Sequence, residues 1–118
     1  MASDCEESRR QALEDLLFLR LPVERAVQRL KEFPWDSERE LAILTRVDAQ
    51  RLLTAFLDGR LVAAQCQEWA FALEGRDDLA LEGGSENLLK NFLFEISSPE
   101  LNGELTTRKA EEWRTRVS

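Results

Sequence analysis

Apolar residues recur three or four positions apart along almost the whole chain, which is the spacing of amphipathic helices. A leucine-rich helix is predicted over residues 8–20. A second helix begins at Pro22, because a proline in the first turn of a helix leaves no donor unsatisfied. This helix ends near Phe33, since Pro34 disfavours helical geometry in the residue before it. Alternating runs of β-branched residues are scarce, so the pattern indicates helices rather than a large sheet.

The segment after Pro34 carries a further helix signal. Ser37 and Glu40 have the spacing of a capping box, in which the serine accepts from the first turn and the glutamate reaches back. A short helix over about residues 38–44 is therefore predicted. Trp35 is expected to pack this turn onto the core.

The rest of the chain predicts four helices separated by glycine-rich or serine-containing turns. They lie between Thr45 and Gly59, over about residues 62–74, over residues 86–97 after Ser85, and from Thr106 onward. Thr45 and Asp48 form a second capping box. In the longest loop, residues 75–85, Leu79 and Leu81 are expected either to anchor the chain or to form a short extended piece. The fold class predicted for residues 1–118 is a compact all-α single domain of five to six short helices, one or two fewer than the seven helical segments described above, with residues 1–7 frayed.

One phrase occurs twice, as LDGRLVAAQCQEW at residues 57–69 and as LNGELTTRKAEEW at residues 101–113. In each copy a glycine can take a positive φ and stop a helix, and a leucine two residues later can pack on the following first turn. The tryptophan at the end of each copy then falls on the inward face of the next helix. We interpret the phrase as one helix-to-helix corner used twice. A duplication of an ancestral segment remains the alternative.

Composition removes most kinds of catalytic chemistry. The chain has no histidine, so the usual general base near neutral pH and the commonest zinc ligand are both missing. Of the two cysteines, Cys5 lies in the N-terminal segment, and Cys66 falls on an apolar helix face, where a thiol behaves as a small hydrophobe. Neither a phosphate-binding loop nor a calcium-loop pattern is present. We therefore predict a protein that is not an enzyme and needs no cofactor or metal.

No apolar run approaches the ~18 residues of a membrane helix, and the N-terminus is acidic and polar, unlike a signal peptide. A cytoplasmic protein without membrane association is expected. The chain carries a net charge of −7, and residues 68–104 contain nine carboxylates against two basic side chains. A direct nucleic-acid ligand is disfavoured, because phosphate binding needs clustered Lys and Arg.

Five carboxylates in or next to the loop at residues 75–85 are the candidate partner-binding residues. They are Glu74, Asp77, Asp78, Glu82 and Glu86. If they converge, they form a negative field suited to a basic protein. The alternative is an ordinary solvated surface, in which Arg76 simply pairs with a neighbouring carboxylate.

Residues from about Pro34 to Glu82 resemble a group of small uncharacterised bacterial proteins. These share a tryptophan near the start, a helix that ends in glycine, and a Trp-Ala-x-x-Leu-Glu-x-Arg-x-Asp segment. The residues that match this last segment are Trp69, Ala70, Leu73, Glu74, Arg76 and Asp78. The resemblance implies a bacterial origin and an all-α fold, and it implies no activity and no catalytic residue.

Three functional hypotheses follow. The first is a non-enzymatic protein-binding protein, most concretely an immunity-type inhibitor that presents an acidic surface to a toxin such as a nuclease. The second is a regulatory or scaffold protein, for example a homodimer, whose partner docks in a groove between helices. The third, an enzyme that uses a carboxylate cluster or a metal, has the least support because the chain lacks histidine.

Overall fold

The computed structural model of the chain describes residues 2–118, most of which lie in helices. The helices are α1 (Ala2–Leu17), α2 (Val23–Leu30), α3 (Arg46–Leu57), α4 (Ala63–Leu73), α5 (Glu86–Ser97), α6 (Pro99–Asn102) and α7 (Thr107–Arg116). Two three-residue strands, β1 (Ala42–Leu44) and β2 (Leu79–Leu81), form the only sheet among the described residues. The predicted all-α fold is confirmed, with this small sheet as an addition.

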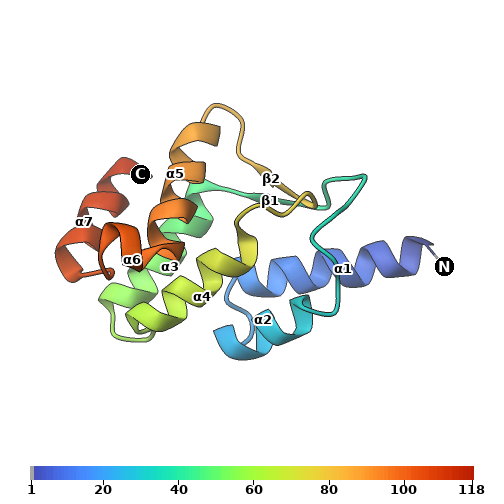
Figure 1. The fold of residues 1–118 in the computed structure, drawn as a ribbon, viewed down its shortest axis with the longest axis horizontal. Helices are drawn as coiled ribbons and strands as arrows, with labels where there is room; N and C mark the ends of the chain where they lie inside the picture. Colours follow the sequence, from blue (N-terminus) through green and yellow to red (C-terminus); the bar gives the residue numbers. More distant parts are fainter. Residues whose placement is uncertain (1) are drawn as a thin grey trace.

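The helices form one elongated body with principal extents of 46 × 30 × 24 Å. At one end α1 packs on α2, and α2 also packs on α4 (Figure 1). At the other end α3 packs on α7, and α4 lies along α5 between the two ends. The N-terminus and α7 therefore lie at opposite ends of the molecule (Figure 1).

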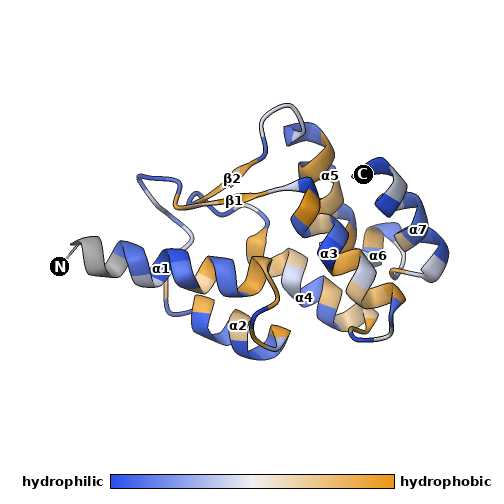
Figure 2. Cartoon of the chain, turned by 180° about the vertical axis from the view of Figure 1, so that it is seen from behind, coloured by the Kyte–Doolittle hydropathy of each residue, from blue (hydrophilic) through white to orange (hydrophobic). Residues whose placement is uncertain are grey.

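The sheet corrects the prediction of a helix over residues 38–44. β1 and β2 are parallel, with Ile43 opposite Ala80, and both strands are strongly apolar (Figure 2). Ser37 Oγ does accept a backbone N–H, but it is that of Arg39 in a local turn, at 3.2 Å. Ser37 therefore marks a turn and not the start of a helix. Pairing with the distant strand β2 decides the conformation of residues 42–44. Leu79–Leu81 forms the extended piece that was one of the two expectations for the loop.

Helix starts were predicted with mixed success. Thr45 and Asp48 form the expected reciprocal capping box, and Thr106 accepts the N–H of Lys109 at 3.2 Å. Ser85 is the residue before α5, but its side chain caps nothing. The nearby Gly84 N–H is instead bound by the Glu86 carboxylate at 3.0 Å.

Aromatic side chains form the centre of the core between α4, α5 and α7. Phe92 makes T-shaped contacts with both Trp69 and Trp113, at centroid distances of 6.3 and 5.2 Å. The Trp69 indole donates to Leu16 O at 2.9 Å, and the Trp113 indole donates to Glu95. The prediction that both tryptophans are core residues is confirmed. Cys66 is also buried, and burial raises the pKa of its thiol to about 12.

The two copies of the repeated phrase build the same turn. Gly59 and Gly103 both have a φ of +82°, as predicted, and Leu61 and Leu105 are half-buried against the core. The elements that lead into the turns differ, since the first follows the 12-residue α3 and the second follows the four-residue α6. The similarity thus covers a corner and the helix that follows it.

Candidate functional site

The five predicted partner-binding carboxylates occupy different environments. Asp78 has no exposed surface and accepts from Arg9 Nε at 2.6 Å and from Arg76 Nε at 2.9 Å. Asp78 is therefore a buried carboxylate paired with two arginines, and it cannot form part of an acidic docking surface. Asp77, next to it, is exposed.

The other three carboxylates contact three separate parts of the fold. Glu74 accepts from Ser97 Oγ at 3.0 Å, at the end of α5. Glu82 accepts the backbone N–H of Arg46 at 2.8 Å, at the start of α3. Glu86 binds the Gly84 N–H within its own turn. Glu74 and Glu82 thus fasten the two ends of the loop at residues 75–85 to α5 and α3, whereas Glu86 stabilises only its own turn. The sequence pattern did not separate these structural uses from partner binding.

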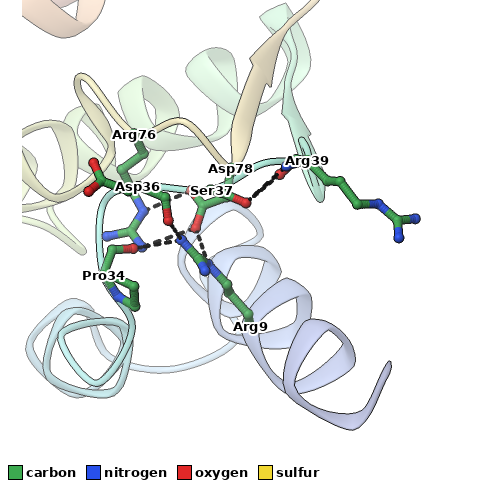
Figure 3. Close-up of polar contacts among 7 residues, drawn as sticks. All are labelled: Arg9, Pro34, Asp36, Ser37, Arg39, Arg76 and Asp78. Carbon is green, nitrogen blue, oxygen red and sulfur yellow. Dashed lines mark hydrogen bonds and ion pairs between the residues drawn. The ribbon is translucent and has the colours of Figure 1, made fainter. Parts of the chain in front are cut away.

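Asp78 lies at the centre of a buried ion cluster, which we call the clamp and define as Arg9, Arg76 and Asp78 (Figure 3). The Arg76 side chain is 3% exposed and the Arg9 side chain 15%. The alternative in which Arg76 pairs with a neighbouring carboxylate is confirmed by its bridge to Asp78, but the pair is buried and not at the surface, because α1 covers it from one side with Arg9. Breaking a buried pair of this kind by removing one partner typically costs about 3–5 kcal/mol.

The clamp also holds the backbone of the segment that follows α2. Arg9 Nη2 donates to Pro34 O at 2.7 Å and to Asp36 O at 2.6 Å, and Arg76 Nη2 donates to Pro34 O at 2.9 Å (Figure 3). The Trp35 carbonyl between these two groups accepts the Asp77 N–H at 3.0 Å. Every peptide group from Pro34 to Asp36 is thus tied to a distant part of the chain.

Trp35 itself does not pack into the core, which contradicts the prediction for this residue. The centroid of its ring lies 5.0 Å from the Arg76 Cζ, and Trp35 as a whole is 42% exposed. The cation–π contact explains this position, because a guanidinium attracts the face of an aromatic ring while its N–H groups remain bound to Asp78 and Pro34 O. Trp35 therefore covers the clamp and faces solvent on its other side.

A groove with a volume of about 680 Å3 runs between α2, α4 and the segment at residues 33–35. Trp35 lies on one side of it and Phe71, which is 64% exposed, projects from α4. The buried residues Leu30 and Ala72 form part of its lining, together with the half-buried Phe33. Among the pockets found in the described residues, this one combines large exposed aromatic side chains with an apolar lining.

The rim of the groove is acidic. Glu24, Glu32 and Glu68 line it and are exposed, against Lys31 as the exposed basic residue. A hydrogen bond from the Gln65 amide, 2.7 Å long, lowers the pKa of Glu24 and keeps this carboxylate ionised. Arg76 also lines the groove, but Asp78 already neutralises its charge. The groove thus presents aromatic surface inside a negatively charged edge.

Sequence reasoning missed this groove, although one signal for it was visible. The inward face predicted for the helix at residues 62–74 consists of Val62, Cys66, Trp69, Ala70 and Leu73, and Phe71 does not belong to that face. The prediction is wrong for Val62, which is 61% exposed. A large aromatic residue on the outer side of a helix is a candidate for contact with a partner. The partner element, Trp35, could not be found in this way because its position depends on residues 9, 76 and 78.

Among the side chains that the structure describes, those of residues 6–118, no group of three or more His, Cys, Asp or Glu is arranged to hold a metal ion. The same part of the chain contains no helix with the length and apolar character needed to cross a bilayer. The chain matches no family model, no curated protein and no solved structure.

Proposed function

We propose that this chain is a non-enzymatic protein-binding protein and that its partner docks in the groove between α2 and α4. The observation that supports this proposal is the pair of exposed aromatic residues, Trp35 and Phe71, beside an apolar lining. Aromatic residues that remain exposed on a monomer and border a pocket are typical of binding hot spots. This groove replaces the loop at residues 74–86 as the centre of the candidate surface.

The occupant that fits best is an amphipathic segment with apolar anchors flanked by Lys or Arg. Its apolar side chains would enter the groove, as amphipathic helices do in helical receptors. Its basic side chains would face Glu24, Glu32 and Glu68 on the rim. The net charge of −7 would speed association with such a partner at low salt.

The most specific form of the proposal is an immunity-type inhibitor of a basic toxin such as a nuclease. The acidic rim supports this form, because the inhibitor's carboxylates would take the place of phosphate groups. A regulatory or scaffold role in which a helix docks in the groove uses the same surface. The two forms share the binding chemistry and differ in the identity of the partner.

A probe peptide tests the binding chemistry directly. The probe is a fluorescently labelled amphipathic helix of leucine and lysine, and its control is the same sequence with glutamate in place of lysine. We expect the wild-type protein to bind the leucine–lysine peptide, more weakly as salt is raised, and not to bind the leucine–glutamate peptide. Equal binding of both peptides, or of neither, would contradict the proposal.

A matched pair of variants locates the binding. Phe71 on α4 and Phe94 on α5 are both exposed phenylalanines, at 64% and 46%, but only Phe71 lines the groove. Phe71→Ala should weaken binding by roughly tenfold or more, and Phe94→Ala should leave it within about twofold. The reverse order would place the partner elsewhere. A concentration-dependent dimer in sedimentation that Phe71→Ala abolishes would place a second copy of this chain in the groove instead.

A further inference from the structure

We propose that Arg76 is a positioning residue for the groove, which fixes the Trp35 ring in the orientation that a partner meets. This inference rests on the proposed function for what the groove binds, whereas the positioning itself can be tested without a ligand. It concerns an arginine that is almost completely buried, and so one that cannot contribute to binding as an exposed charge.

The geometry of Arg76 gives it three separate contacts. Its Nε and Nη2 donate to the two carboxylate oxygens of Asp78 at 2.9 and 3.1 Å, which fixes the plane of the guanidinium. Its Nη2 also donates to Pro34 O at 2.9 Å, which holds the peptide group before Trp35. Its Cζ lies over the Trp35 ring, 5.0 Å from the ring centroid. One side chain thus controls both the backbone and the ring of Trp35.

Arg9 provides a natural comparison within the same clamp. It shares Asp78 and Pro34 O with Arg76 and adds a bond to Asp36 O, so both arginines hold the backbone of the segment (Figure 3). The cation–π contact with Trp35, however, belongs to Arg76. Replacing each arginine by lysine keeps a positive charge beside Asp78 and removes the planar fork. Only the change at Arg76 also removes the guanidinium that contacts the Trp35 ring.

The positioning can be measured at the three tryptophan indole N–H groups by NMR of 15N-labelled protein. The indoles of Trp69 and Trp113 are held by hydrogen bonds in the core and serve as internal controls for folding. In Arg76→Lys we expect the heteronuclear NOE of the Trp35 indole to fall, while the other two keep their wild-type values. Arg9→Lys should lower the Trp35 value less. An unchanged Trp35 value in Arg76→Lys would overturn the proposal.

The contact between Arg76 and Trp35 can also be tested in the wild-type protein, so the test does not depend on whether Arg76→Lys folds. The 5.0 Å separation of the Arg76 Cζ from the Trp35 ring centroid predicts proton–proton NOEs between the two side chains in the wild type. Their absence would overturn the positioning role whatever the variant does.

Binding of the leucine–lysine peptide connects positioning with function. Arg76→Lys should raise the dissociation constant of the peptide roughly fivefold, and Arg9→Lys should raise it less than about twofold. If the wild type binds the peptide and Arg76→Lys changes neither the indole NOE nor the affinity, the positioning role fails and the proposed function stands. If the wild type does not bind while the Trp35 NOEs behave as expected, the proposed function fails and the positioning role stands.

Discussion

Two regions of this molecule use tryptophan in opposite ways. In the core where α4, α5 and α7 meet, Trp69 and Trp113 are buried against Phe92 and their indole N–H groups are bound inside the protein. At the end built by α1, α2 and the clamp, Trp35 is held outside the core on a charged side chain. The first arrangement gains stability from apolar burial. In the second arrangement, the buried clamp holds an aromatic ring at the surface. Because this ring lines the groove, the groove is the candidate functional site.

Removing the buried tryptophan of α4 should have the largest effect. Trp69→Ala deletes a side chain with no exposed surface and should lower the free energy of unfolding by about 4 kcal/mol. Urea unfolding followed by circular dichroism measures this loss. Trp35→Ala is the matched control and should cost much less, because 42% of Trp35 is already exposed. Similar losses for the two variants would remove the contrast between the two regions.

Removing the carboxylate of the clamp should come next. Asp78→Ala leaves Arg9 and Arg76 in a largely buried site without their shared counter-charge, and the free energy of unfolding should fall by about 3 kcal/mol. Asp77→Ala, at the exposed neighbour, should change it by no more than about 0.5 kcal/mol. A loss at Asp78 as small as that at Asp77 would mean that the clamp contributes little to the fold.

The thiol of Cys66 makes the tryptophan-rich region sensitive to alkaline pH. Its pKa is raised from 9.0 to about 12 by burial, so the unfolded chain loses this proton at lower pH than the folded protein does. Stability contributed by the neutral thiol is complete below pH 9 and is lost as pH rises toward 12. At pH 10 the loss relative to pH 8 should be about 1 kcal/mol greater in the wild type than in Cys66→Ala. Parallel pH profiles for the two proteins would contradict this.

The smallest effect on stability is expected at the groove itself. Phe71→Ala should change the free energy of unfolding by no more than about 0.5 kcal/mol, because the side chain is 64% exposed. The same variant should lose most of its affinity for the leucine–lysine peptide. Loss of binding without loss of stability is the signature of a residue used for contact with a partner. A destabilisation above about 1.5 kcal/mol would instead show that Phe71 serves the fold.

The tryptophan-rich region could be predicted from local sequence, and the clamp could not. Helical spacing located α4 and α5, and the two glycine corners follow from residue types within each repeated phrase. Arg9 and Asp78 are 69 positions apart, and nothing local marks either as a buried partner of the other. The same limitation explains β1, because the pairing of Ile43 with Ala80 depends on the tertiary fold. The usual burial of tryptophan predicts that Trp35 lies in the core, whereas its actual contact with Arg76 depends on the clamp.

The most direct test of the groove as the docking surface is an NMR titration of the 15N-labelled protein with the leucine–lysine peptide. The proposal predicts chemical-shift changes at the Trp35 indole and at backbone amides of α2, α4 and residues 33–35, which diminish as salt is raised. The Trp113 indole, buried at the other end, should not shift. Changes confined to residues 82–86 or to α7, with Trp35 unaffected, would contradict the assignment of the groove.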